Sequence, residues 1–183
     1  TETVYGLAAD AHSPEAAACI FAAKGRPAGN PLIVHVDSVE MARGCVAVWP
    51  SAAAQLAGAF WPGPLSLVLP KADSIPDIVT AGGKTVAVRC PAHPVFSAVL
   101  VKCGFPLAAP SAHRSNRVSS TRAEHVVDPL GGHIPLVLDG GACDLGIEST
   151  VIDLTGDTPT LLRPGMISLG QLQAVLGSVA TAK

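Results

Sequence analysis

The chain has 183 residues, of which 49% are hydrophobic and 14% are charged, and its formal net charge is −2. This length suits a single domain with a sizeable core, and high hydrophobicity with low charge excludes an intrinsically disordered chain. The near-neutral charge excludes a basic protein that coats nucleic acid, so any contact with RNA would be local.

Helix and strand signals alternate through the first half of the chain. Ser13, Pro14 and Glu15 form a helix start, because Ser caps the first turn, Pro fits its backbone and Glu complements the dipole. Turns rich in Gly and Pro separate the apolar runs. The elements predicted here are helices from Ser13 to Lys24, from Asp37 or Ser38 to Val46 and from Ser51 (as cap) to Ala59, and strands at 31–36, 65–69 and 85–89.

The second half continues the alternation and then brings strands at shorter spacing. Thr121 and Glu124 form a capping-box pattern that opens a helix, and Ser168 caps a last helix, which Gly177 ends. The other elements predicted here are a helix at 94–103 closed by Gly104 and strands at 107–110, 136–139, 150–154 and 160–163. Interleaved strands and helices indicate an α/β fold with a mixed sheet, in one domain over 1–183.

No segment predicts a membrane anchor or a secretory signal. The apolar runs stay below the roughly 18 to 20 residues that span a bilayer. The five cysteines are widely spaced and lack a CxxC pair, which favours free thiols of a cytoplasmic protein over disulfides or metal ligands. The chain opens at Thr1-Glu2-Thr3 without Met, so we expect that a strand before Thr1 is missing.

Polar side chains stand at the ends of several predicted apolar strands. These residues are Arg89, Ser111, Ser149 and Arg163, and the loop after the first helix adds Lys24 and Arg26. Each cation alone is more simply a surface or ion-paired residue, and Lys24 could balance the helix dipole. Ligands of open α/β sheets bind outside strand ends, and cations there suit phosphate or carboxylate groups. Their co-occurrence favours one site for a nucleotide and a small anionic substrate.

The common nucleotide and hydrolase motifs are absent from the sequence. It has no GxxxxGK[ST] loop and no GxGxxG after a strand. It also has no HExxH or His/Cys cluster for zinc and no Gly-x-Ser-x-Gly. A nucleotide must therefore be bound by another kind of site.

Eight blocks of sequence follow, in order and at matching spacing, the pattern of one known family. The blocks are 1–7, 24–27 with 30–36, 61–69, 86–91, 109–112, 138–141, 146–154 and 162–165. On these blocks the chain resembles the YrdC/TsaC family of L-threonylcarbamoyladenylate synthases. Each block alone is a weak signal, but together they cover nearly the whole chain and are specific.

The resemblance implies both a fold and a reaction. The fold is a twisted, mixed and largely parallel open α/β sheet with flanking helices and a concave basic cavity, YrdC-like or DHBP-synthase-like. The reaction joins ATP, L-threonine and bicarbonate or CO2 into threonylcarbamoyl-AMP, with release of pyrophosphate. Mg2+ would accompany ATP through its phosphates, and no side chain would hold a metal. The product would feed tRNA threonylcarbamoyl-transferase proteins that modify adenosine in tRNA.

The resemblance also implies a role for each site residue. L-Threonine would be bound by Thr1, His35, Arg89 and Ser149, with Arg89 on its carboxylate. ATP would be bound by Lys24, Arg26, Asn30, Ser66, Ser111, His113 and Arg163, of which Lys24, Arg26 and Ser111 would be catalytic. Attack of a carbamate on the α-phosphorus needs charge neutralisation and alignment more than a nucleophilic side chain, and these residue types supply both.

Three positions depart from the family pattern, and two other functions stay open. His113 stands where Asn is usual, Asn116 where Gly is usual, and Ser66 where Thr is usual. The basic loop 113–125, with Arg114, Arg117 and Arg122, could bind double-stranded RNA or tRNA by shape. Alternatively, the chain could be the carbamoyl-adenylate-forming domain of a larger carbamoyltransferase.

Overall fold

The computed structural model describes residues 1–113 and 118–182, which contain one eight-stranded sheet in the order β1-β5-β2-β4-β3-β6-β7-β8. The strands are β1 (Ala9–Asp10), β2 (Ile33–His35), β3 (Leu65–Pro70), β4 (Thr85–Arg89), β5 (Leu107–Ala108), β6 (Thr150–Asp153), β7 (Thr160–Arg163) and β8 (Ala180–Thr181). The pairs β2–β4, β3–β6 and β7–β8 are parallel and the others antiparallel, so β1, β2, β4, β7 and β8 share one direction. The predicted mixed open sheet is confirmed.

Local signals set the ends of most helices. α1 (Pro14–Lys24) begins where the Ala16 amide donates to Ser13 Oγ, and it ends at Gly25 with a φ of 57°. Serine hydroxyls also cap α2 (Val39–Cys45) and α6 (Leu169–Leu176), as predicted. α3 (Ser51–Phe60) and α4 (Pro94–Cys103) have no side-chain cap. The prediction that Ser51 caps α3 is wrong, because Pro50 holds the extended cap position and Ser51 is already helical.

Two further predictions are wrong. Thr121 caps no helix, because α5 (Glu124–Leu130) starts after Ala123, whose backbone is itself helical. Residues 136–139 form no strand, and Leu136 and Leu138 instead stand largely exposed at the rim of a second, apolar pocket. The strand predicted at 31–36 pairs only over its middle, and the two-residue strands β1 and β8 had no signal in the sequence.

The sheet has an apolar face and a polar face, because successive side chains of a strand point to opposite sides. Val34, Leu67 and Val88 point into the main core, where they are fully buried with apolar residues of α1, α2, α3 and α6. Burying each such side chain contributes about 1.5–3 kcal/mol. His35 and Arg89 follow Val34 and Val88 along β2 and β4, and they line a cavity instead. The core on one face thus leaves the other face open for function.

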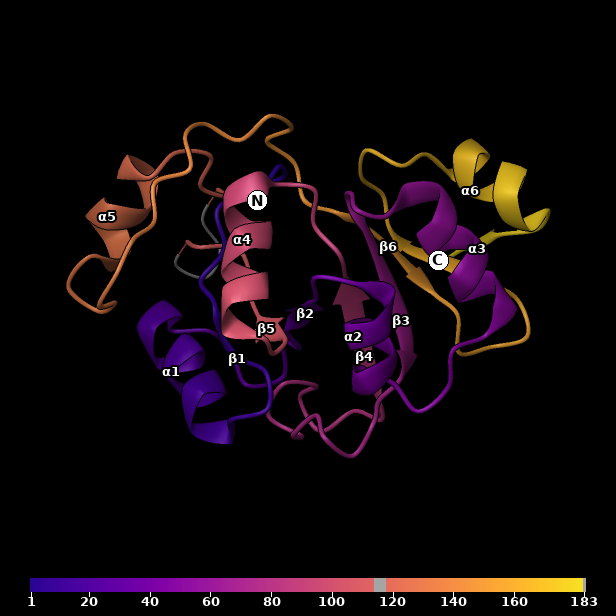
Figure 1. Cartoon of the computed structure of the whole chain (residues 1–183), viewed down its shortest axis with the longest axis horizontal. Helices are drawn as coiled ribbons and strands as arrows, with labels where there is room; N and C mark the ends of the chain where they lie inside the picture. Colours follow the sequence, from indigo (N-terminus) through magenta and orange to yellow (C-terminus); the bar gives the residue numbers. More distant parts are fainter. Residues whose placement is uncertain (114–117, 183) are drawn as a thin grey trace.

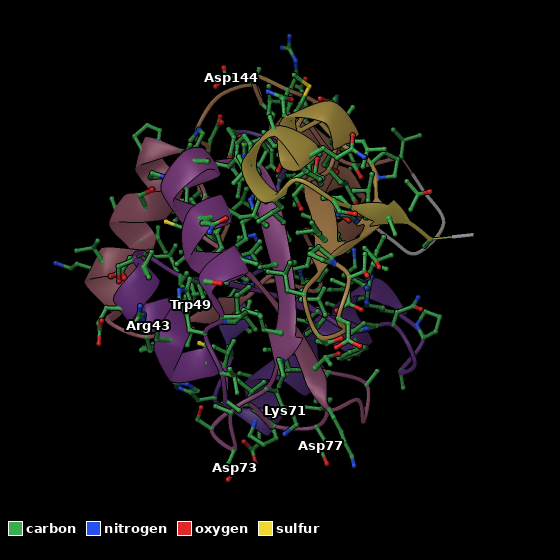
Figure 2. The ribbon with its side chains drawn as sticks, turned by 90° about the vertical axis from the view of Figure 1, so that its right-hand side faces the viewer. Arg43, Trp49, Lys71, Asp73, Asp77 and Asp144 are labelled. Carbon is green, nitrogen blue, oxygen red and sulfur yellow. The ribbon has the colours of Figure 1, made fainter. Side chains whose placement is uncertain are left out.

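The segment 118–149, which leads into β6, leaves the sheet. It runs out to α5 and returns across the top of the view to β6 (Figure 1). A small second core of Ala112, Val126 and Leu130 holds it together. At the end of the molecule opposite Asp144, an ion pair of Lys71 Nζ with Asp77 Oδ1 at 3.2 Å braces the loop between β3 and β4 (Figure 2). Within the described residues, no helix has both the length and the apolar character that crossing a bilayer requires.

Candidate functional site

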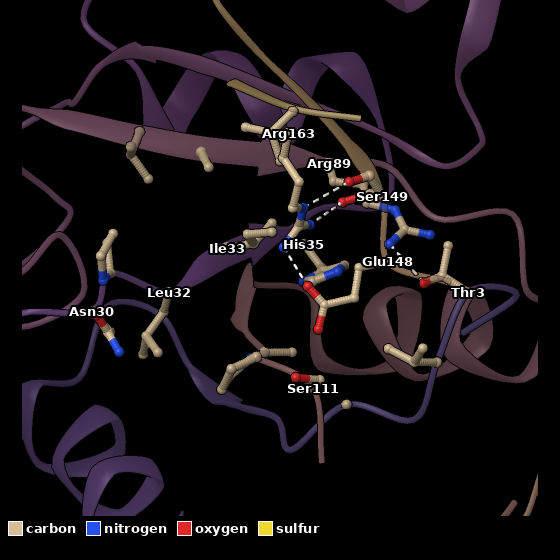
Figure 3. A pocket seen from close by; sticks show the side chains of 18 of the residues that line it. Thr3, Asn30, Leu32, Ile33, His35, Arg89, Ser111, Glu148, Ser149 and Arg163 are labelled. Atoms are coloured by element: carbon tan, nitrogen blue, oxygen red, sulfur yellow. Dashed lines mark hydrogen bonds and ion pairs between the residues drawn. The ribbon is translucent and has the colours of Figure 1, made fainter. Parts of the chain in front are cut away.

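A cavity of about 580 Å³ opens on the polar face of the sheet (Figure 3). This volume lies within the range of roughly 300–1,000 Å³ that small-molecule sites occupy. The predicted site residues that line it are Thr1, Lys24, Arg26, Asn30, His35, Arg89, Ser111, His113, Ser149 and Arg163. Residues from the first, middle and last parts of the chain therefore meet in one place.

Arg89, the last residue of β4, is held in place by three contacts at one end of the cavity. Its Nε donates to Gly63 O at 3.1 Å, one terminal nitrogen donates to Thr3 Oγ1 at 3.0 Å, and the other pairs with Glu2 Oε1 at 2.5 Å. The side chain is buried, and burial lowers the pKa of its guanidinium while the Glu2 carboxylate opposes that change. Thr3 Oγ1 also lies 2.8 Å from Thr1 Oγ1. A buried guanidinium in a fixed position and two threonine hydroxyls thus meet at this end of the cavity.

His35 lies beside Arg89, because the two residues are register partners in the parallel pair β2–β4. Its ring packs edge-on against Phe96 of α4 with 5.4 Å between ring centroids. Burial, and then the charge of Arg89, lowers the pKa of His35 to about 3, so the imidazole is neutral. Its Nδ1 is buried without a hydrogen-bond partner among the described residues. The ring of His35 thus lines this end of the cavity without adding a charge.

Lys24 ends α1 and turns its ammonium into the cavity. Nζ donates to the backbone carbonyls of Ser111 and His113, and the side chain is only 2% exposed. Burial and the neighbouring Arg26 lower the pKa of Lys24 to about 8, although Glu148 opposes the shift. Because an ammonium has three donors and the described residues accept two of them, the third is left for a ligand. Lys24 thus fixes the loop at 111–113 and can still contact an anion.

Arg26 and Asn30 lie at the rim of the cavity. Arg26 Nε donates to Asn30 O at 3.1 Å, and its NH2 donates to Pro31 O at 2.9 Å. Burial lowers the pKa of the Arg26 guanidinium, against the effect of Glu148. The side chain of Arg26 is half-buried and Asn30 is exposed. These two residues can contact the solvent-facing part of a long ligand.

Arg163 and Glu148 form an ion pair in the wall of the cavity. Arg163 also donates from Nε to Ser149 O at 3.0 Å and from NH2 to Ser149 Oγ at 3.1 Å. Burial alone would raise the pKa of Glu148, but Arg163 and the hydroxyls of Ser111 and Ser119 outweigh it and lower that pKa. Glu148 is therefore a stable negative charge among the cations of the site.

Ser66 stands behind the cavity and not in its wall. It is fully buried, and its Oγ lies 2.8 Å from Ser149 Oγ, so it supports the residue that holds Arg163. Ser111 and His113 form the facing wall, where Ser111 Oγ lies 2.7 Å from His113 Nε2. The contact of Ser66 with ATP stays a prediction, and Arg114, Asn116 and Arg117 lie outside the described residues.

Sequence reasoning missed three residues of the site: Glu2, Thr3 and Glu148. Thr3 had a signal, because residues two apart in an extended segment share a side and Thr1 was already predicted. Glu148 directly precedes Ser149, but its place among cations depends on folding. Within residues 1–113 and 118–182, no group of three His, Cys, Asp or Glu side chains could hold a metal ion.

One known family and several curated proteins are similar to this chain over most of its length. The Sua5/YciO/YrdC family, described as telomere recombination, matches residues 1–165. The threonylcarbamoyl-AMP synthase of Pyrococcus abyssi is 48% identical over 179 residues, which are 98% of this chain and 53% of that protein. That of Bacillus subtilis is 46% identical over 184 residues, which are 100% of this chain and 53% of that protein.

One solved structure agrees with the fold in detail. The crystal structure of P. abyssi Sua5 complexed with L-threonine is 47% identical, with a TM-score of 0.97 over 100% of this chain and 54% of that chain. The chain spans about half the length of the curated relatives it matches.

Proposed function

The chain belongs to the Sua5/YciO/YrdC family, and we propose that it makes threonylcarbamoyl-AMP and pyrophosphate from ATP, L-threonine and bicarbonate or CO2. The family that the eight sequence blocks resemble is thereby confirmed. One observation carries the proposal: a single cavity holds the buried Arg89, paired with Glu2, together with the cations Lys24, Arg26 and Arg163. The relatives' names and the L-threonine complex of P. abyssi Sua5 support it.

The end of the cavity around Arg89 suits L-threonine. The guanidinium offers donors to the carboxylate, and charge-assisted hydrogen bonds of this kind are about twice as strong as neutral ones. The hydroxyls of Thr1 and Ser149 and the neutral ring of His35 lie around it and can bind the amine and hydroxyl. With a pKa of about 3, the His35 imidazole is neutral at physiological pH, so one ring nitrogen can donate a hydrogen bond and the other can accept one.

The opposite part of the cavity suits the phosphates of ATP. Lys24 and Arg26 line it, with the hydroxyl of Ser111 also in its wall and Asn30 at the rim, and Arg163 lies between the two parts because its NH2 donates to Ser149 Oγ at 3.1 Å. Cations that are already held in place stabilise charge that develops on a transferring phosphoryl group without reorganisation. Lys24 and Arg163 are held by the hydrogen bonds described above, which fits that requirement.

The reaction needs no covalent enzyme intermediate. The amine of L-threonine adds to CO2 and loses a proton to give a carbamate. A carbamate oxygen then attacks the α-phosphorus of ATP, the new P–O bond forms, and the bond to pyrophosphate breaks. The protein contributes by holding two substrates in line and by neutralising the leaving pyrophosphate.

Mg2+ fits this site when it is bound by the phosphates of ATP and not by a set of protein side chains. Glu148 is the one carboxylate among the described lining residues, and it is engaged by Arg163. A hard cation such as Mg2+ keeps its waters and binds substrate phosphates. Bound to ATP, it would supply further neutralisation of the triphosphate, and Glu148 is the side chain that could face it.

The product is proposed to pass to tRNA threonylcarbamoyl-transferase proteins in the cytoplasm. Direct contact with RNA stays a prediction, because Arg114 and Arg117 of the basic loop lie outside the described residues. The rival function of a carbamoyltransferase domain differs in the substrate that it requires, so an activity assay separates the two.

Pyrophosphate release tests the proposed function. The protein with ATP, Mg2+, bicarbonate and L-threonine should release pyrophosphate, and omission of any one component should reduce release to background. Carbamoyl phosphate should not replace L-threonine and bicarbonate. Release that ignores L-threonine, or that needs carbamoyl phosphate, would refute the proposal.

A further inference from the structure

We propose that Glu2 is a positioning residue for substrate recognition: its carboxylate orients the Arg89 guanidinium and offsets its charge, so that this end of the cavity selects a carboxylate over a phosphate. The inference rests on the proposed function and deepens it. Glu2 is not among the lining residues, so it acts on a ligand only through Arg89.

Arg89 and Glu2 form a buried ion pair with 2.5 Å between NH2 and Oε1, and they are 3% and 7% exposed. Arginine has five N–H donors. Three of them go to Gly63, Thr3 and Glu2 within the described part of the chain. One donor therefore remains on each terminal nitrogen, and Arg89 lines the cavity in which a carboxylate could accept these donors.

The backbone around Glu2 is fixed by the segment that leads into β6. Leu145 N donates to Glu2 O at 2.9 Å, and Gly146 N donates to Thr3 O at 3.0 Å. The same segment continues into Glu148 and Ser149, which line the cavity. The position of the Glu2 carboxylate is thus tied to the wall of the site and is not that of a loose terminal residue.

A buried ion pair is a poor device for stability alone. The cost of removing both charges from water often cancels their attraction, and apolar replacements of such pairs are often neutral or stabilising. The second carboxylate oxygen of Glu2 is buried without a hydrogen-bond partner among the described residues, which adds to the cost. The buried carboxylate of Glu2 is therefore better explained by its effect on Arg89 than by a contribution to stability.

The ion pair of Arg89 and Glu2 also favours binding of the two anionic substrates at different places in the cavity. The charges of Arg89 and Glu2 cancel, and Arg163 between the two parts is paired with Glu148, whereas the second group, Lys24 and Arg26, forms no ion pair within the described residues. A multiply charged phosphate is therefore drawn to the second group, and a monoanionic carboxylate can be held by oriented donors at the first. Without Glu2, both ends would attract phosphate.

Calorimetric titrations with L-threonine, and separately with a non-hydrolysable ATP analogue plus Mg2+, test the inference. Glu2→Ala should weaken L-threonine binding about 10- to 100-fold, the worth of one hydrogen bond to a charged group, and change nucleotide affinity less than about twofold. Glu2→Gln keeps an acceptor for Arg89 and should bind L-threonine within about threefold of the wild type. Glu40→Ala, at an exposed carboxylate of α2, is the control and should change neither affinity.

Competition by pyrophosphate distinguishes the effect of the Glu2 charge from its effect on the orientation of Arg89. Glu2→Gln changes the Arg89 end from 0 to +1, so pyrophosphate should compete with L-threonine about tenfold more strongly than in the wild type. Unchanged L-threonine affinity in Glu2→Ala, equal loss of both affinities, or no gain in pyrophosphate competition would overturn the inference. A wild-type protein that binds no L-threonine would overturn the proposed function, and this inference with it.

Discussion

Raising the pH through 8 should weaken nucleotide binding, because Lys24 loses its charge there. Burial and Arg26 lower the pKa of this ammonium to about 8 from the usual 10.5. Lys24 is therefore a cation below pH 8 and becomes neutral as the pH rises through that value. Its attraction for a phosphate is present below pH 8 and is lost above it.

The size of the effect follows from the pKa. At pH 9, one unit above the pKa, about one molecule in ten keeps the proton, so affinity should fall about tenfold relative to pH 7 if binding requires the ammonium. Binding at pH 8 to 9 should also take up a proton, because a phosphate favours the charged form. The lowered pKa makes the free energy of unfolding rise with pH between about 8 and 10.5, since the unfolded chain holds the Lys24 proton in that window and the folded chain does not.

Calorimetry with a non-hydrolysable ATP analogue and Mg2+ at pH 7, 8 and 9 measures the affinity, and buffers of different ionisation enthalpy report the proton uptake. Lys24→Arg is the matched variant, because a guanidinium stays charged throughout this range. Its affinity should be flat with pH. If Lys24→Arg shows the same fall as the wild type, another group titrates and the reasoning about Lys24 is refuted.

Two further predictions concern the walls of the cavity. Ser149→Ala leaves the buried Ser66 hydroxyl without its partner, so it should cost about 1–3 kcal/mol of unfolding free energy, and the double variant with Ser66→Ala should cost less than the sum of the singles. Chemical denaturation measures this, and strict additivity would contradict the contact. His113→Asn removes the imidazole that lies 2.7 Å from Ser111 Oγ and should raise kcat/KM for ATP. An unchanged rate would show that this position tolerates either residue.

Local signals allowed most of the fold to be predicted. Ser13, Ser38 and Ser168 mark helix starts through bonds to amides three residues on, and Gly25 and Gly104 mark helix ends through left-handed backbone. β1 and β8 escaped prediction, because a two-residue strand exists only through pairing with a distant segment. The apolar run at 136–139 lines a pocket without pairing, so hydrophobicity alone misled the strand prediction.

Only part of the candidate site could likewise be predicted from the sequence. Arg89 and Arg163 could be predicted because a charge that ends an apolar strand contradicts the pattern around it. Glu2 and Glu148 could not, because a carboxylate in a loop has the same local signal whether it faces solvent or a cation. Glu2 meets Arg89 across 87 positions of chain, a distance over which sequence patterns carry no contact information.

Isotope incorporation tests the central claim most directly. The protein with ATP, Mg2+, L-threonine and 13C-bicarbonate should give threonylcarbamoyl-AMP that carries one 13C atom, detected by mass spectrometry, in amounts equal to the pyrophosphate released. Arg89→Ala should abolish the L-threonine-dependent product. Pyrophosphate release without the labelled adenylate would contradict the account.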